Sequence, residues 1–215
     1  MVEQNRKIRI SPSILSLPIN EISERIKKVE DNIDYIHIDV MDGKFVTNIT
    51  NGVEMFNEAK KASNKPLDVH LMVENPIEEM KKYKGADIIT FHIEAVEATQ
   101  TLNVIEAVKM QGAKVGISIK PNTSVKSLIN ILDKIDLVLI MTVEPGYGGQ
   151  ELIKEALLKV SELRNLGYEK IIEVDGGINL ENAPEVRITG VDIIVAGTAI
   201  FSAENENIAI NKIRG

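Results

Sequence analysis

The sequence contains no cysteine and no tryptophan. Without cysteine, the chain can form no disulfide and can offer no thiolate as a nucleophile or metal ligand. Aromatic residues make up only 4% of the chain, which is too few for a surface on which nucleic-acid bases would stack. A net charge of −7 also disfavours non-specific binding to a phosphate backbone. We therefore expect no nucleic-acid partner.

Long apolar runs are also missing. The longest such stretches, for example residues 137–143, are far shorter than the roughly 20 apolar residues that a transmembrane helix requires. The first seven residues are polar and lack the apolar segment of a signal peptide. We expect a soluble, cytoplasmic protein with no membrane partner.

What the sequence does contain is a regular alternation of two kinds of segment. Apolar segments typical of buried strands alternate with amphipathic segments of helical period, at roughly 25 residues per unit. The predicted strands span residues 8–14, 35–40, 67–73, 87–93, 114–119, 136–143, 170–175 and 191–196. The predicted helices include residues 22–30, 53–62, 77–83, 102–111, 125–132, 155–166 and 204–213.

This alternation predicts an α/β fold with a parallel sheet covered by helices. Eight units favour a closed (β/α)8 barrel, a single domain over residues 1–215. A doubly wound open sheet is the alternative. The barrel is favoured because polar residues end several predicted strands, and only closure brings all of those ends to one mouth.

The most unusual of these polar residues are His37 and Asp39, which lie on the same face of one predicted strand. Burying both without partners would cost several kcal/mol, so a bound metal or a substrate is expected beside them. His70 and Asp175 end two other strands in the same way. Two imidazoles and two carboxylates suit Zn, Fe(II), Mn or Co. The alternative is that each is only a satisfied polar residue at a strand end. We interpret His92, also at a strand end, as a support or structural residue rather than a ligand.

The two carboxylates predict a reaction type. Asp39 and Asp175 belong to strands that are well separated around a ring, so they would approach a central substrate from opposite sides. One could remove a proton from carbon while the conjugate acid of the other returns a proton to the opposite face. A metal would stabilise the enediolate formed between these steps.

Other strand ends carry methionine or glycine. Met41, Met72 and Met141 either fill gaps in the core or form an apolar wall around the intermediate. Glycine-rich segments at residues 144–150, 175–178 and 197–199 either make tight turns or present backbone amides to a phosphate group. Ser13 could bind a substrate hydroxyl.

Several blocks at these positions resemble the ribulose-phosphate 3-epimerase family. They are SPSIL at 11–15, HIDVMDG at 37–43, DVHLMV at 68–73, MTVEPG at 141–146, GGQ at 148–150 and VDGGI at 174–178. The resemblance implies a TIM barrel of the ribulose-phosphate-binding type that interconverts D-ribulose 5-phosphate and D-xylulose 5-phosphate in the non-oxidative pentose phosphate pathway. It also implies a homo-oligomer, one divalent metal per subunit and Asp39 and Asp175 as the acid/base pair. The implied substrate-binding residues are Ser13, His70, Gly146, Tyr147, Gly148, Gly149, Asp175, Gly176, Gly177, Gly197 and Thr198.

Four positions depart from the family pattern. Thr47 stands where proline is usual, Asn51 where an aromatic residue is usual, Tyr147 replaces phenylalanine and Thr198 replaces serine. Because the first two lie in a loop that should border the substrate, D-allulose 6-phosphate is an alternative substrate. The double glycine at 176–177 favours the pentulose phosphate. A lyase or binding protein of the same barrel group is a further alternative, for which Lys120 is the nearest strand-end lysine.

Overall fold

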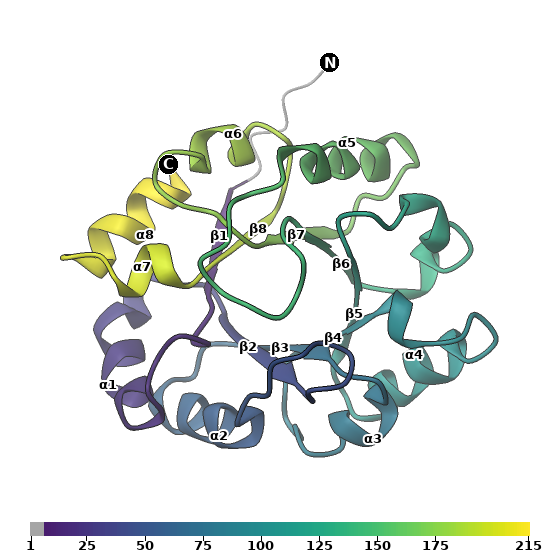
Figure 1. Cartoon of the computed structure of the whole chain (residues 1–215), viewed down its shortest axis with the longest axis horizontal. Helices are drawn as coiled ribbons and strands as arrows, with labels where there is room; N and C mark the ends of the chain where they lie inside the picture. Colours follow the sequence, from purple (N-terminus) through teal and green to yellow (C-terminus); the bar gives the residue numbers. More distant parts are fainter. Residues whose placement is uncertain (1–6) are drawn as a thin grey trace.

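Eight parallel strands form a ring at the centre of the computed structural model, which describes residues 7–215 (Figure 1). The strands are β1 (Arg9–Pro12), β2 (Ile36–Met41), β3 (Leu67–Met72), β4 (Ile88–His92), β5 (Lys114–Ile119), β6 (Leu137–Met141), β7 (Ile171–Asp175) and β8 (Ile193–Ala196). Their order is β1-β8-β7-β6-β5-β4-β3-β2. The predicted (β/α)8 barrel is therefore confirmed, and seven of the predicted strands contain an observed one, while β2 extends one residue beyond the predicted range, to Met41.

The ring closes between β1 and β2 through few contacts. Ser13 forms an isolated parallel bridge with His37, and the amide of Ile14 donates to the carbonyl of His37 at 3.2 Å. Closure therefore occurs beside the strand that carries His37 and Asp39, and it brings Ser13 next to them.

Helices surround the ring on its outside (Figure 1). They are α1 (Ile19–Val29), α2 (Gly52–Ala62), α3 (Pro76–Met80), α4 (Thr101–Met110), α5 (Leu158–Asn165), α6 (Ala183–Arg187), α7 (Thr198–Phe201) and α8 (Glu206–Arg214). Short 3-10 turns also occur at Glu30–Asn32, Ile93–Ala95, Val125–Leu128, Leu132–Lys134 and Lys154–Leu157. The short α6 and α7 lie outside the predicted helices, whereas the equally short α3 lies at the helix predicted over residues 77–83.

The helix predicted over residues 125–132 is wrong, since two separate 3-10 turns occupy this part of the chain. Val125, Leu128 and Ile131 are buried, a spacing of three residues that matches the three residues per turn of a 3-10 helix. The side chain of Ser124 caps the first turn by accepting from the amide of Lys126. An apolar period of three was thus mistaken for one of 3.6.

The core has two parts because strand side chains alternate in direction. Most buried apolar residues lie between the strands and the helices. A smaller apolar cluster fills the barrel interior and includes Ile88, Leu137, Leu139 and Ile193. The parallel register aligns His37 with Asp68 and Asp39 with His70 across β2 and β3. The polar residues are therefore neighbours inside the ring.

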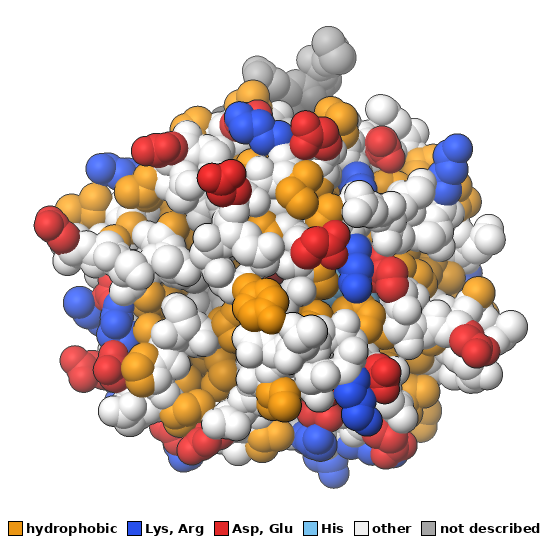
Figure 2. Space-filling view, viewed as in Figure 1, with side chains coloured by type: hydrophobic (Ala, Val, Ile, Leu, Met, Phe, Trp, Pro, Cys, Tyr) orange, Lys and Arg blue, Asp and Glu red, His pale blue; other side chains and the backbone are white. Residues whose placement is uncertain are grey.

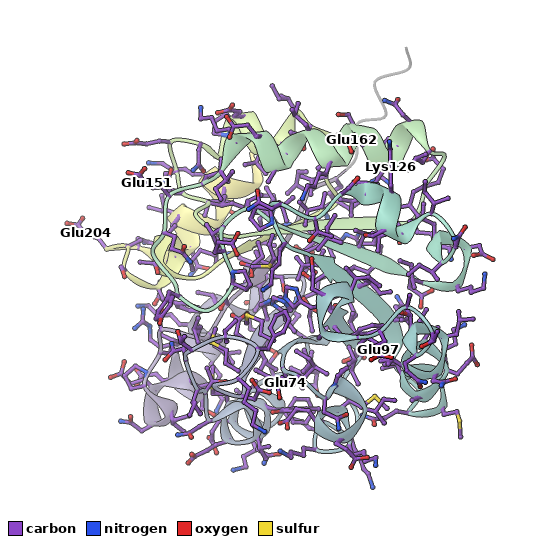
Figure 3. The ribbon with its side chains drawn as sticks, turned by 45° about the vertical axis from the view of Figure 1, so that its right-hand side comes forward. Glu74, Glu97, Lys126, Glu151, Glu162 and Glu204 are labelled. Atoms are coloured by element: carbon purple, nitrogen blue, oxygen red, sulfur yellow. The ribbon has the colours of Figure 1, made fainter. Side chains whose placement is uncertain are left out.

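Charged groups lie mainly on the periphery. Figure 2 shows the face viewed in Figure 1, where Lys, Arg, Asp and Glu side chains are mostly spread around the rim. The labelled Glu97, Lys126, Glu151, Glu162 and Glu204 are exposed side chains on the outside of the barrel (Figure 3). Within residues 7–215, no helix has the length and apolar character needed to cross a membrane.

A candidate metal centre at the mouth of the barrel

The four predicted ligands converge inside the barrel. β2 supplies His37 and Asp39, β3 supplies His70, and Asp175 is the last residue of β7. One potential ligand atom from each of the four residues lies within 4.8 Å of the others. The two histidines are fully buried, and Asp39 is only 3% exposed. Strand alternation and closure of the ring thus produce the cluster that the sequence predicted.

The spacing of the ligand atoms fits one cation. His37 Nε2 lies 3.4 Å from Asp39 Oδ1 and 3.9 Å from Asp175 Oδ2. His70 Nδ1 lies 3.1 Å and 3.9 Å from the same two oxygens. Ligands bound tetrahedrally at about 2.0–2.1 Å would be separated by about 3.4 Å. The buried His37 Nε2 also has no hydrogen-bond partner among the described residues. The donor set therefore suits a divalent transition metal.

The imidazole of His37 is oriented by Asp68. His37 Nδ1 lies 2.7 Å from Asp68 Oδ2, and Asp68 is itself 1% exposed. A proton on Nδ1 that is donated to this carboxylate leaves the lone pair of Nε2 directed at the cluster. Such carboxylate–histidine pairs fix the tautomer of a ligating imidazole.

The pKa values of the two candidate acid/base residues are shifted in opposite directions. Burial would raise the pKa of Asp39, but the charges and hydrogen bonds of His37 and His70 outweigh it and hold that pKa far below its usual range. Burial, together with the negative charge of Asp39, raises the pKa of Asp175 to about 6. Carboxylates whose pKa values are pushed apart can act as base and acid in one reaction. Ser13 supports the ionised form of Asp39 by donating to Oδ2 at 2.6 Å.

A cavity of about 700 Å³ opens above the cluster. Its lining includes Ser13, Asp39, Asp175, the three predicted methionines Met41, Met72 and Met141, and the predicted residues Gly146, Tyr147, Gly148, Gly149, Gly176, Gly177, Gly197 and Thr198. His37 and His70 do not line it, since they lie beneath its floor. None of the described residues of the lining is Lys or Arg. An anion in this cavity would therefore be bound by backbone amides and hydroxyl groups.

Two glycines set the shape of the turn after β7. A Cβ on Gly177, where φ is +68°, would lie 2.4 Å from the amide nitrogen of Leu152. A Cβ on Gly176, where φ is +121°, would lie 2.4 Å from Val143 Cγ2. Both the backbone angle and the lack of space therefore require glycine. The turn after β7 packs directly under the segment that follows β6.

Two loops meet above the cavity. The loop after β6 runs across the centre of the ring in Figure 1. Thr47 Oγ1, in the loop after β2, lies 2.5 Å from the hydroxyl of Tyr147, and Asn48 Nδ2 donates to the carbonyl of Gly146 at 3.2 Å. Two of the departures from the family pattern, Thr47 and Tyr147, are thus hydrogen-bonded to each other. Neither proline nor phenylalanine could make this bond.

Sequence reasoning overlooked three acidic residues near the cluster. Asp68 contacts His37, Glu94 contacts His92, and Glu173 is fully buried with both carboxylate oxygens unpartnered among the described residues. Burial, with the nearby charge of Asp68, raises the pKa of Glu173 well above its usual value. The two-residue period of a strand could have identified two of them. Asp68 precedes His70 by two residues and Glu173 precedes Asp175 by two, so each lies on the same strand face as a predicted ligand.

Comparison with known proteins identifies the family. The family model described as "Ribulose-phosphate 3 epimerase family" matches residues 9–201. The ribulose-phosphate 3-epimerase of Bacillus subtilis (strain 168) is 42% identical over 216 residues, which cover 97% of this chain and 99% of that protein. The chain belongs to the ribulose-phosphate 3-epimerase family. The resemblance found in the sequence blocks is confirmed, and the protein is an isomerase, an epimerase that acts on carbohydrates.

A relative from another organism and a solved structure are also similar to this chain. The ribulose-phosphate 3-epimerase of Methanocaldococcus jannaschii is 40% identical, over 96% of this chain and 90% of that protein. Among solved structures, 3-hexulose-6-phosphate synthase from Salmonella typhimurium superposes with a TM-score of 0.74 over 96% of this chain and 96% of its own. Its sequence identity is only 19%, so this likeness supports the barrel fold alone.

Proposed function

We propose that the protein interconverts D-ribulose 5-phosphate and D-xylulose 5-phosphate, as a step of the non-oxidative pentose phosphate pathway, by proton transfer at C3. The observation that carries the proposal is the cluster of His37, Asp39, His70 and Asp175 directly under a cavity of about 700 Å³. Family membership supports the substrate, and the opposed pKa values of the two carboxylates support the reaction type.

The four residues of the cluster would hold one divalent cation, with Zn, Fe(II), Mn and Co all suited to two imidazoles and two carboxylates. When bound, the cation would act as a Lewis acid that stabilises negative charge on the substrate oxygens. The charges around His37 also favour a cation: burial lowers the pKa of His37, but Asp68 and Asp39 raise it well above its usual value. The raised pKa shows that this position favours a positive charge, and a bound cation would supply that charge in place of the second proton on the His37 imidazole.

Asp39 and Asp175 would carry out the proton transfers. The ionised Asp39 takes the C3 proton from one side of the sugar, and the protonated Asp175 delivers a proton from the other side. In the reverse direction the two residues exchange roles. Oδ1 of Asp39 faces the histidines while Oδ2 accepts from Ser13, and these contacts fix the orientation of the carboxylate before the transfer.

The cavity walls would protect the enediolate and bind the phosphate. Met41, Met72 and Met141 are at most 3% exposed and offer no proton to the intermediate. The turns at Gly146–Gly149, Gly176–Gly177 and Gly197–Thr198 would bind the phosphate with backbone N–H groups and the Thr198 hydroxyl. Homo-oligomeric assembly and a cytoplasmic location stay predictions of the sequence.

Turnover of D-ribulose 5-phosphate in heavy water, followed by NMR, tests this proposal. We expect deuterium at C3, loss of activity after treatment with a chelator, and recovery when metal is returned. Full activity of rigorously metal-free protein would contradict the ligand assignment, and release of CO2 or formaldehyde would contradict epimerisation. A higher kcat/KM on D-allulose 6-phosphate than on D-ribulose 5-phosphate would contradict the pentulose substrate.

A further inference from the structure

The third histidine of the chain, His92, contacts one of the candidate ligands. It is the last residue of β4 and is fully buried. Its Nε2 lies 2.9 Å from Nε2 of His70, and its Nδ1 lies 3.1 Å from Oε2 of Glu94. Glu94, His92 and His70 therefore form a continuous chain of hydrogen bonds that leads from the barrel rim to the cluster.

Only one arrangement of protons along this chain is compatible with metal binding by His70. Nδ1 of His70 is the atom that faces Asp39 and Asp175, so its lone pair must be free for the cation. The proton of His70 then lies on Nε2 and is donated to Nε2 of His92. Because a neutral imidazole carries one proton, His92 holds its own proton on Nδ1 and donates it to Glu94.

The far end of the chain is fixed by the fold. Oε1 of Glu94 accepts from the backbone amide of Lys120 at 2.8 Å, which leaves Oε2 for His92. The ring of Phe45 packs against His92 in a tilted arrangement, with 4.8 Å between the ring centroids, and Nζ of Lys120 lies 4.3 Å from the centre of the Phe45 ring. The imidazole of His92 is therefore held in both position and orientation.

The two histidine ligands are thus oriented differently. His37 donates directly to the carboxylate of Asp68, whereas His70 reaches a carboxylate only through a second imidazole. We propose that His92 and Glu94 are positioning residues that fix the tautomer and ring orientation of His70 and thereby strengthen metal binding. This inference rests on the proposed metal site.

The test compares the affinity of purified, metal-free variants for Zn²⁺, measured by competition with a chromophoric chelator at one pH above 7. In His92→Phe, the Nε2–H of His70 loses its acceptor while a planar aromatic ring, somewhat larger than imidazole, is kept, so we expect binding about 10–100-fold weaker. His92→Gln restores an acceptor for His70 and a donor for Glu94, so most of the affinity should return. The absorption spectrum of bound Co²⁺ should change in the Phe variant and recover in the Gln variant.

Ser118→Ala is the matched control. Ser118 is aligned with His92 in the register of β4 and β5, is fully buried, and its hydroxyl has no partner among the described residues. Its removal should change Zn²⁺ affinity less than about twofold, because it supports no ligand. Circular dichroism of each metal-free variant would check that the barrel is folded.

Glu94→Gln provides a second test that preserves the shape of the site. A carboxamide replaces one acceptor oxygen by NH2, so it cannot accept from both the Lys120 amide and His92 Nδ1. We expect Zn²⁺ affinity to fall severalfold or more.

Two results would overturn the inference. One is that His92→Phe binds Zn²⁺ as tightly as the wild type while His92→Gln binds it more weakly. This order of affinities is expected if the ring of His92 serves only for packing. The other is unchanged affinity in Glu94→Gln. If the wild-type protein itself bound neither Zn²⁺ nor Co²⁺, the proposed metal site would fail, and the inference with it.

Discussion

Gly176 offers a quantitative test of how the mouth of the barrel is built. In Gly176→Ala, the new Cβ would lie 2.4 Å from Cγ2 and 2.9 Å from Cγ1 of Val143. Such overpacking against the buried Val143 costs about 1–3 kcal/mol. The φ of +121° adds a backbone cost of about 1–3 kcal/mol for a residue with a Cβ. We expect the free energy of unfolding to fall by about 2–6 kcal/mol.

The chain contains a matched control at Gly112. Its φ is +86°, also in the region that favours glycine, but a Cβ there would meet nothing within 4 Å. Gly112→Ala should therefore lose only the backbone part, about 1–2 kcal/mol. The difference between the two variants measures the contact with Val143 together with the difference in backbone cost at the two φ values.

Urea denaturation would measure the loss of unfolding free energy in both variants. The proteins should be metal-free, because bound metal would add its binding free energy to the stability. The contact itself is isolated by a double-mutant cycle with Val143→Ala, in which Gly176→Ala should cost about 1–2 kcal/mol less than it does in the wild-type background. Equal losses for Gly176→Ala and Gly112→Ala, together with no coupling to Val143, would refute this account of the turn.

Three further predictions concern the site. Asp175→Asn should keep the fold, checked by circular dichroism, but lower kcat by about 10²–10⁴-fold, since an amide cannot transfer the proton; near-full activity would exclude the two-acid mechanism. Because the pKa of Asp175 is raised to about 6 in the folded, metal-free protein, its stabilising contribution is greatest below the unfolded pKa near 4 and is lost as the pH rises through 6. The free energy of unfolding of the wild type should therefore fall by roughly 2 kcal/mol relative to that of Asp175→Asn between pH 4 and pH 7 in urea titrations, and parallel curves would contradict the raised pKa. Thr47→Val and Tyr147→Phe remove the two hydroxyls that bond at 2.5 Å across the mouth, so each should raise KM about two- to fivefold and the double variant no further; additive effects on KM would show that the bond is not formed.

The sequence by itself determined the architecture and the four candidate ligands. Eight apolar segments separated by amphipathic ones specify strands and helices, and the two-residue period of a strand places His37 and Asp39 on one face. Where the period was weak or ambiguous, as in α6, α7 and the two turns after β5, prediction failed. The same period places Asp68 on the face of β3 that carries His70, whereas its position beside His37 depends on the register of β2 and β3.

Only the tertiary structure decided which atoms of the candidate ligands face one another and what holds them. His37 presents Nε2 and His70 presents Nδ1, because the other nitrogen of each ring is engaged by a residue from a neighbouring strand, Asp68 for one and His92 for the other. Likewise, Thr47 and Tyr147 are 100 positions apart and meet only because the ring closes. A sequence specifies periodicity and chemistry locally, whereas hydrogen-bond partners between distant segments depend on strand register and on closure of the barrel.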